Sequence, residues 1–521
     1  MRSLNNDTTY TLNYHEATKH SEISMQTSAH YLDWANKPSQ FKTYENLASI
    51  ALPEHFPRPD SKPLTAISGR PFQRQVSNLR LAELAELLYF SAGLTRKYRF
   101  GGELHYMRAA SATGALYPIE LYVVAGDIVG LEAGIYHFDP LGFQLSRIRT
   151  GDYRAVLAAL SDDGIALAPA TIAFTSLAWK NAWKYEARSY RHWFWDGGVI
   201  AANLLAASNS IGLPTKIVHG FVDQTVNELF GLEDGKEATI CLSPVGLRRQ
   251  ASTDRSVKEI DPIFLKVHPL STEETEYPSM WEAHRASFLL NREEVDKWTN
   301  ARPAHPHSPE ATYPTMPLLP PMIEAANSRN LGEVILKRGS TRRFARSPIG
   351  FFQLSTILRT SIGAIPRDYF PDGDSLIETY IVANAVEGLD AGSYFYSDEQ
   401  ESLEQLKRGE FRQMSAYLCL GQPLFGDASV VLFLMTRLRD VLGTLGNRGY
   451  RAAQLEAGIV AGRIYLSAYS LDLGASGSTF YDDAVTEFFS PHSKKKSTMI
   501  AVGLGVPDYK ARPGKILPQF T

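Results

Sequence analysis

The sequence contains little cysteine and no long apolar run. Cys241 and Cys419 are its two cysteines among 521 residues, too few for a disulfide framework and suited to a reducing compartment. No run of about 18 apolar residues is present, so no transmembrane helix is expected. The first ten residues are polar and lack the apolar stretch of a signal peptide. These absences predict a cytoplasmic protein that has no contact with a membrane.

An excess of charge of either sign is absent as well. The formal net charge is −3, from 53 Lys and Arg against 56 Asp and Glu, so no general attraction to nucleic acid or anionic lipid is expected. His15, His20 and His30 lack a metal-binding spacing, and no metal site is predicted. No P-loop or Gly-x-Gly-x-x-Gly stands between a strand and a helix, which argues against a Rossmann dinucleotide site.

What the sequence does have is length, an ordinary apolar content and one dense group of prolines. At roughly 150 residues per domain its length predicts two to four domains, and a hydrophobic fraction of 44% is ample for a large core. A charged, irregular stretch reaches about residue 300, and seven prolines that exclude helix and central strand follow it: Pro303, Pro306, Pro309, Pro314, Pro317, Pro320 and Pro321. We divide the chain into a leader (1–60), a first unit (61–255), a linker (256–321) and a second unit (322–512).

The second unit repeats the first. Four pairs of segments align with an offset of 258 to 260 residues: 119–136 with 377–394, 151–154 with 409–412, 190–191 with 450–451, and 221–223 with 480–482. Two copies of one α+β unit are therefore expected. They are predicted to pack as an internal pseudo-dimer, in which the linker replaces a second chain and the protein need not associate further.

Periodicity and residue type predict the elements of the first unit and of the leader. We expect helices at 79–94, 151–160 and 186–211, strands at 119–124, 130–139, 170–175 and 238–243, and short leader helices at 14–20 and 30–35. The leader is expected either to recognise a peptide or to pack on the core.

The two copies differ between their first helix and their first strand. Leu84 aligns with Leu354 at an offset of 270, whereas Ile119 aligns with Ile377 at 258, so the second copy is 12 residues shorter there. The part it lacks is a loop of small side chains that begins at an arginine: Arg108, Ser111, Ala112, Thr113, Gly114 and Ala115. Such a loop lets a flat ligand approach backbone N–H groups. The alternative is a structural turn before a core strand.

The second copy opens with an arginine-rich pattern that the first copy does not have. Arg338, Ser340 and Arg342 alternate, so on an extended backbone the three side chains share one side. Two guanidinium forks and a hydroxyl suit a phosphate or a planar polar ligand. The first copy has 69–74 in this region, without that spacing. The alternative is a solvated basic surface.

These motifs together resemble the nitroreductase-like flavoproteins, and more narrowly the SagB/ThcOx-type dehydrogenases, with two such units fused. The resemblance rests on Arg-x-Ser-x-Arg, on Gly114-Ala-Leu-Tyr-Pro-Ile-Glu-Leu-Tyr122 and on Lys184-Tyr185. It implies an FMN-dependent oxidoreductase with FMN at the interface of the two units. Arg338, Ser340 and Arg342 would then bind the phosphate end, and the loop from Arg108 to Ala115 would lie under the flavin ring.

The resemblance also implies one FMN per chain, because each copy has lost the half that the other keeps. Gly477 and Ser478 would approach the ring edge, where glycine lets backbone N–H groups come close. The sequence departs from the family at Ser111-Ala112, where the family carries Pro-Ser, so a hydroxyl contact at that position is not carried over. The mirror site is expected to be empty.

Lys184 and Tyr185 have no counterpart in the second copy, which has Leu445-Gly-Asn-Arg-Gly-Tyr450. The resemblance places this pair over the flavin in azoline-oxidising members, where burial would let one of them act as a general base. The implied reaction is dehydrogenation of a small-molecule or peptide substrate. The resemblance suggests azoline-to-azole oxidation in peptide natural-product biosynthesis, together with biosynthetic partner proteins. Three alternatives stay open: an amphipathic helix start at Lys184, an NAD(P)H-dependent nitroreductase or quinone reductase, and a non-catalytic scaffold.

Overall fold

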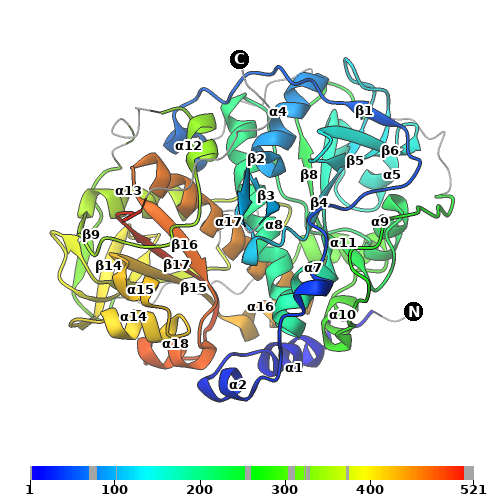
Figure 1. The fold of residues 1–521 in the computed structure, drawn as a ribbon. Coiled ribbons are helices and arrows are strands. Elements are labelled where there is room, and N and C mark those ends of the chain that lie inside the picture. The colour runs from blue at the N-terminus through cyan, green and yellow to red at the C-terminus, as the bar shows by residue number, and fades with distance from the viewer. Residues whose placement is uncertain are drawn as a thin grey trace.

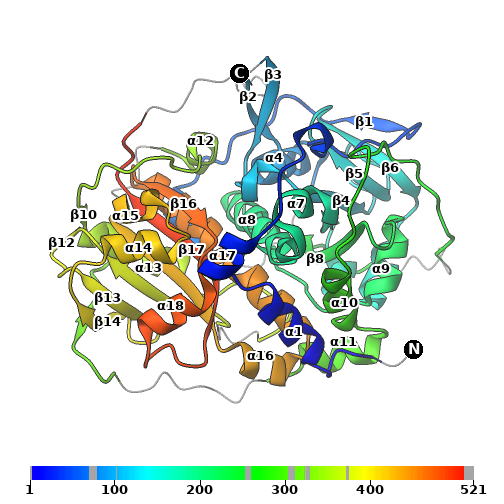
Figure 2. The same cartoon turned by 60° about the horizontal axis from the view of Figure 1, so that its bottom comes forward.

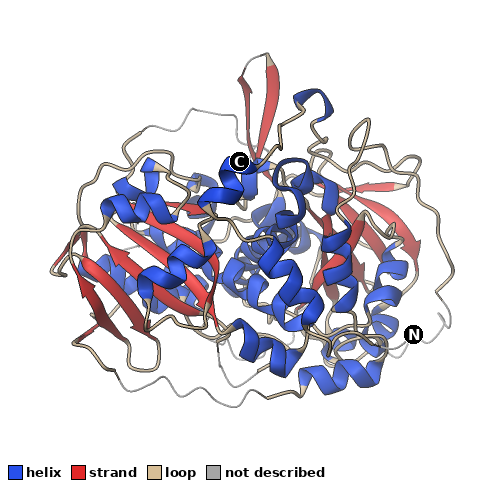
Figure 3. Cartoon of the chain, turned by 90° about the horizontal axis from the view of Figure 1, so that it is seen from below, coloured by secondary structure: helices blue, strands red, loops and turns tan. Residues whose placement is uncertain are grey.

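The computed structural model describes residues 3–69, 79–100, 102–252, 260–302, 311–321, 323, 329–370 and 375–509. Two β-sheets lie on opposite sides of a central block of helices, one sheet from each half of the chain (Figure 1 and Figure 3). No helix of these described parts is long and apolar enough to cross a membrane.

The first sheet has the order β1-β6-β5-β4-β7-β8, and neighbouring strands run antiparallel. Its strands are β1 (Ser49–Ala51), β4 (Ile119–Ala125), β5 (Gly134–Asp139), β6 (Gln144–Thr150), β7 (Ala170–Leu177) and β8 (Glu237–Val245). Every residue of β4 is buried, because β5 and β7 flank it and helices cover the sheet. This explains why its sequence is apolar almost throughout rather than alternating.

The second sheet has the order β16-β17-β15-β11-β13-β14-β9. Its strands are β9 (Thr315–Pro317), β11 (Glu378–Ala383), β13 (Gly392–Ser397), β14 (Ser402–Arg408), β15 (Val430–Thr436), β16 (Gly474–Ser478) and β17 (Ser497–Gly505). The series β14-β13-β11-β15-β17 repeats β6-β5-β4-β7-β8 of the first sheet. The predicted α+β fold with two tandem units is therefore confirmed.

The helices follow the same repeat. Those of the first unit are α3 (Pro63–Ser68), α4 (Leu81–Ala92), α5 (Arg154–Ala159), α6 (Gly164–Leu167), α7 (Ala178–Tyr185), α8 (Ser189–Ser210) and α9 (Asp223–Phe230). Those of the second are α12 (Leu331–Lys337), α13 (Phe351–Ser361), α14 (Arg412–Leu418), α15 (Pro423–Asp427), α16 (Leu438–Leu445), α17 (Arg448–Ser470) and α18 (Asp482–Phe489). The two long helices, α8 and α17, pack directly on each other. A Cβ added to Gly198 would lie 2.6 Å from the backbone of Gly458, so only glycine permits this approach.

Ion pairs across the interface obey the internal symmetry. Nη1 of Arg191 donates to Oδ1 of Asp482 at 2.7 Å, and Nη1 of the equivalent Arg451 donates to Oδ1 of the equivalent Asp223 at 2.7 Å. In each case a second arginine, three residues earlier, contacts the same carboxylate. Reciprocal contacts of this kind characterise an isologous interface, so the two units form the expected pseudo-dimer within one chain.

The leader packs along the line where the units meet. Its elements are α1 (Thr9–Ala17), α2 (Glu22–Thr27), the 3-10 turn η1 (Trp34–Asn36) and β1. The Tyr14 ring lies edge-on to the rings of Tyr190 and Tyr450, one from each unit. The helix expected at 14–20 thus begins earlier and ends at Ala17. The one expected at 30–35 is wrong, because only the short turn η1, capped by the Asp33 carboxylate, forms there.

Two further stretches differ from the sequence-based expectation. The charged segment expected to be irregular contains α10 (Pro278–Ala286) and α11 (Arg292–Thr299), whose buried tryptophans, Trp281 and Trp298, face the core. An unpredicted hairpin, β2 (Leu94–Phe100) with β3 (Glu103–Arg108), projects from the body of the molecule (Figure 2). A small parallel pair joins β10 (Ile349–Gly350) to β12 (Val386–Glu387).

Candidate functional site

The small-residue loop joins the hairpin strand β3 to the core strand β4 and is held in place by two buried cations, Arg108 and Lys180. The Arg108 guanidinium donates to the carbonyl oxygens of Ile119 and Gln40, both at 3.3 Å. The buried Lys180 ammonium donates to the Tyr117 carbonyl at 3.2 Å and to Oε1 of Glu120 at 3.0 Å. These charged hydrogen bonds give the loop a fixed path.

The loop turns through a short 3-10 segment, η2 (Thr113–Ala115). Gly114 has φ of +63°, a conformation that glycine adopts without strain. The Ala115 N–H donates to the Ala112 carbonyl at 3.0 Å and closes the turn. The positive φ, together with the Tyr185 hydroxyl 2.8 Å from the place a Cβ would take, gives Gly114 a structural reason beside the functional one.

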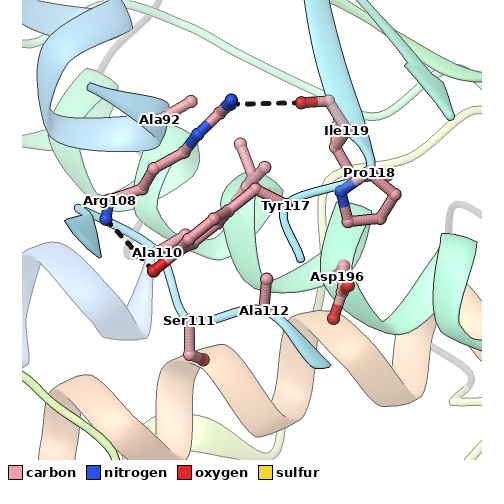
Figure 4. Close-up of a pocket in the computed structure, with 10 residues that line it drawn as sticks. Ala92, Arg108, Ala110, Ser111, Ala112, Tyr117, Pro118, Ile119 and Asp196 are labelled. Atoms are coloured by element: carbon pink, nitrogen blue, oxygen red, sulfur yellow. Dashed lines mark hydrogen bonds between the residues drawn. The ribbon is translucent and has the colours of Figure 1, made fainter. Parts of the chain in front are cut away.

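A pocket lies between this loop and helix α8 (Figure 4). It is lined by Ala92, Arg108, Ala110, Ser111, Ala112, Tyr117, Pro118, Ile119, Asp196 and Ile200. Most of these side chains are small or apolar, and Asp196 is the one carboxylate among them. The pocket lining is therefore mainly apolar, with Arg108 and Asp196 as its two charged residues.

Asp196 ties the loop to two helices. Its Oδ1 accepts hydrogen bonds from the N–H and the hydroxyl of Thr113, both at 2.8 Å, and Oδ2 accepts one from the Asn181 amide at 3.2 Å. Burial raises the pKa of Asp196 to about 6, although these hydrogen bonds oppose the rise. Asp196 was not among the predicted site residues. The signal for it was a lone acidic residue inside an otherwise apolar helix.

Arg338 of the second unit reaches the loop of the first. Its Nε donates to the Ala109 carbonyl at 3.0 Å and its Nη2 to the Arg108 carbonyl at 3.2 Å. The guanidinium also lies 5.9 Å from the centre of the Tyr465 ring. The structure thus brings the two motifs together across the interface, although they stand some 230 residues apart in sequence.

Ser340 and the β16 segment meet at the same tyrosine. The Ser340 hydroxyl lies 3.4 Å from the Tyr465 hydroxyl, which accepts the Gly477 N–H at 2.5 Å. The Ser478 hydroxyl donates to the Thr479 carbonyl at 2.7 Å. Tyr465, which had no sequence signal, is therefore the residue that links these two parts of the second unit.

Arg338, Ser340 and Arg342 do not share one side of a strand, as the alternation had suggested. The segment follows α12 and belongs to no strand; Arg338 is buried, Ser340 is half-buried and Arg342 is exposed. Arg342 forms no ion pair with any described residue. The corresponding first-copy residues cannot be compared, because 70–74 lie outside the described residues.

Lys184 and Tyr185 end helix α7 beside the loop. A Cβ on Gly114 would lie 2.8 Å from the Tyr185 hydroxyl, and the Lys184 ammonium lies 5.4 Å from the centre of the Tyr185 ring. Burial, with the positive charges of Arg342 and Lys37, lowers the pKa of Lys184. Burial, with the Asp196 carboxylate, raises the pKa of Tyr185. All the predicted motifs therefore lie around one region between the units.

The described residues contain no group of three His, Cys, Asp or Glu that could hold a metal ion.

The whole chain resembles a solved structure. A nitroreductase-type protein from Anabaena variabilis superposes with a TM-score of 0.75 and 25% identity, over 96% of this chain and 99% of that one. Among curated relatives, a nitroreductase-type protein of Methanocaldococcus jannaschii is 31% identical over 172 residues, 33% of this chain and 82% of its own length.

Two further relatives are processing proteins of bacterial peptides. The trifolitoxin-processing protein TfxB of Rhizobium leguminosarum bv. trifolii is 36% identical over 21% of this chain, and the microcin B17-processing protein McbC of Escherichia coli is 24% identical over 26%. The matches span 31% and 52% of these two relatives. These two relatives bear out the resemblance to SagB/ThcOx-type proteins that the sequence indicated.

The model of the nitroreductase family matches residues 69–247 and again 335–506, once in each unit. Both matched stretches contribute to the region where the loop, Arg338 and Lys184 meet. With this model matched twice along its length, the chain belongs to the nitroreductase family and is a nitroreductase-like oxidoreductase in which two units are fused.

Proposed function

We propose that this chain binds one FMN between its two units and uses it to dehydrogenate a substrate. The observation that supports this best is the pair of hydrogen bonds from Arg338 of the second unit to the loop carbonyls of the first. A site assembled from both units explains why each copy keeps a motif that the other lacks.

The residues present fit a flavin mononucleotide. Arg342 is an exposed guanidinium without an ion pair among the described residues, as a phosphate ligand requires. The loop from Ala109 to Ala115 has no large side chain, and the Gly477 N–H and the Ser340 hydroxyl both contact the Tyr465 hydroxyl. Bound there, FMN would supply a two-electron acceptor.

The opposite pKa shifts of Lys184 and Tyr185 suggest separate roles for them. A Lys with a lowered pKa is more often neutral, so Nζ of Lys184 can accept the proton that leaves a substrate carbon. A Tyr with a raised pKa keeps its proton, so Tyr185 can donate a hydrogen bond and orient the substrate. Lys184 is therefore proposed as the base and Tyr185 as a positioning residue.

The substrate class is proposed from the processing relatives. Oxidation of an azoline to an azole removes two hydrogens: Lys184 would take one as a proton, and FMN bound at the site would supply the acceptor for the other together with its electron pair. A ring in a peptide chain would enter beside Lys184, and partner proteins would deliver it. Repeated turnover would need oxygen or another electron acceptor.

An NAD(P)H-dependent nitroreductase or quinone reductase is the second candidate, favoured by the whole-length match to a nitroreductase-type protein. Such a reductase needs no base for a substrate carbon. Lys184→Ala should therefore abolish dehydrogenation and leave NADH oxidation unchanged, with Lys337→Ala, an exposed lysine outside the pocket, as the control. Loss of neither activity in Lys184→Ala would contradict the role given to Lys184.

Flavin content is the primary test. Purified protein should be yellow and carry close to one FMN per chain by absorbance. A ratio near two would contradict the composite site, because two equal sites would then exist. A colourless protein that cannot be reconstituted with FMN would favour the third candidate, a scaffold without chemistry.

A further inference from the structure

The internal symmetry identifies the mirror image of the proposed site. The offset of 259 residues that relates Asp223 to Asp482 also relates His219 and Gly220 to Ser478 and Thr479. The mirror site should therefore lie where the backbone at His219 and Gly220 faces residues 366–370, the described start of the segment that stands in place of the small-residue loop in the second unit.

A carboxylate of that segment occupies the mirror position. Oδ1 of Asp368 accepts the His219 N–H at 2.9 Å, and Oδ2 accepts the Gly220 N–H at 2.8 Å. The flanking backbone pairs as well: the Ile217 N–H donates to the Pro366 carbonyl at 2.8 Å, and the Asp368 N–H donates to the Ile217 carbonyl at 3.0 Å. The two carboxylate oxygens of Asp368 thus accept hydrogen bonds from two consecutive backbone N–H groups. A bound ligand with two acceptor atoms would use the same two donors.

The space around this carboxylate is filled. A Cβ on Gly220 would lie 2.6 Å from the Thr299 methyl group and 3.1 Å from Oδ2 of Asp368. The Tyr369 ring lies 6.2 Å from the His219 ring and 5.3 Å from the Trp298 ring. Helix α11 of the linker therefore covers this region, and no flat ligand fits between it and Gly220.

The segment is fastened by a second carboxylate. Glu456 of α17 accepts from Arg367 at 2.6 Å and from the Leu376 N–H at 2.8 Å. Glu456 stands 260 residues after Asp196, the residue that holds the loop in the first unit. Equivalent carboxylates on the two long helices thus hold different segments, an open loop in one unit and a filling segment in the other.

We propose that Asp368 is an internal ligand of the second site, where its carboxylate takes the two backbone donors that would otherwise face a bound flavin and so closes this site to any cofactor. The comparison with flavin rests on the proposed function, whereas the carboxylate site at His219 and Gly220 does not. The site recognises a carboxylate, and the chain supplies it.

The test removes this carboxylate in the full-length protein. In Asp368→Ala, native-state hydrogen exchange at the amides of His219 and Gly220 should accelerate by about tenfold or more, the effect of losing a charge-assisted hydrogen bond. Added formate should restore slow exchange at these two amides by occupying the vacated place. Asp390→Ala removes a carboxylate that is 58% exposed in the same unit and should change neither amide.

Asp368→Asn guards against a variant that fails to fold, because it keeps the shape and one acceptor. It should accelerate exchange at one of the two amides, and formate should not reverse this. Unchanged exchange in both Asp368 variants, or acceleration that formate leaves unaltered in Asp368→Ala, would overturn the proposal.

Flavin content separates this proposal from the proposed function. If the protein is colourless and Asp368→Ala accelerates amide exchange as expected, the proposed flavin site is wrong and the proposal of an internal ligand is supported. If the protein carries one flavin per chain and amide exchange is unchanged in Asp368→Ala, the proposed flavin site is supported and the internal ligand is wrong. Two flavins per wild-type chain would overturn the closure, because the second site would then be open.

Discussion

Replacing Asp482 by alanine is expected to destabilise the protein far more than replacing its neighbour Asp483. Asp482 is 3% exposed and lies between the guanidinium groups of Arg188 and Arg191, whereas Asp483 is 80% exposed and, within the described parts of the chain, pairs with Lys19 alone. The two aspartates share a helix N-terminus and differ in burial and partners. Their comparison therefore isolates the buried cross-unit ion pairs.

The magnitude follows from what each substitution leaves behind. Without Asp482 two buried guanidinium groups face each other uncompensated, which costs about 3–5 kcal/mol. The His20 N–H also loses its acceptor, Oδ2 of Asp482 at 2.8 Å. Asp483→Ala removes only a surface ion pair, about 0.2–1 kcal/mol. By the internal symmetry Asp223→Ala should cost nearly as much as Asp482→Ala.

Guanidinium chloride titration, followed by far-UV circular dichroism and tryptophan fluorescence, measures these differences. Arg188 and Arg191 outweigh the effect of burial and hold the pKa of Asp482 well below its usual range. A carboxyl whose folded-state pKa is depressed stabilises the protein at pH values above its unfolded-state pKa. The difference in the free energy of unfolding between wild type and Asp482→Asn should therefore decrease as the pH falls below about 4. Equal losses in Asp482→Ala and Asp483→Ala would refute the role of the cross-unit ion pairs.

Three other outcomes are expected. Arg338→Ala should lower flavin content without lowering the helix signal, because it removes the hydrogen bonds that join the two halves of the site; unchanged flavin binding would contradict the composite site. Gly114→Ala should lower the free energy of unfolding by about 1–2 kcal/mol because of its positive φ, and further because the new Cβ must displace the Tyr185 hydroxyl. Gly212→Ala measures the effect of the positive φ alone, because Gly212 has φ of +71° and no atom lies within 4 Å of the place its Cβ would take. Asp196 has a folded pKa of about 6 against 3.8 in a free chain, so its contribution to stability should fall by about 1.4 kcal/mol per pH unit as the pH rises towards 6; thermal melts at pH 5 and pH 7 should differ less in Asp196→Asn than in wild type.

The elements with a strong residue pattern were predictable from the sequence. Strand β4, fully buried between two neighbours, carries an uninterrupted apolar run, and the long helix α8 lies within two or three residues of the expected 186–211. The repeat predicted the pairing of units because the same residues recur at a constant offset. Two of the four repeated segment pairs contain the buried arginines and aspartates of the interface.

Other elements gave weak or misleading signals. Helix α11 is rich in charge, and its two buried positions, Val295 and Trp298, are too few to make an apolar stripe visible. Its start depends on the Asn291 side chain, which caps the Glu294 N–H at 3.0 Å. The hairpin β2–β3 is mostly polar, so neither alternation nor apolar content indicated it.

The residues of the candidate site also fall into two groups, those that the sequence indicated and those that it did not. The motif residues on the loop and around Arg338 were found because the repeat exposed their asymmetry. Asp196, Tyr465 and Asp368 were not found, since each acts through contacts between segments far apart in sequence: Asp196 with Thr113, Tyr465 with Ser340, Asp368 with the backbone at His219. Such contacts depend on packing and not on local pattern.

The fusion of two units into one chain explains how the two sites could become different. In a homodimer every substitution appears in both sites, so a carboxylate that fills one pocket would fill the other. In the proposed arrangement Asp368 and Glu456 act on the second site alone, while Asp196 holds Thr113 and with it the loop of the first site. The symmetric arginine–aspartate pairs preserve the interface that both arrangements need. A covalent link therefore lets the interface remain symmetric for stability while the sites beside it diverge, as we propose for a first site that binds a ligand and a second site that the chain itself closes.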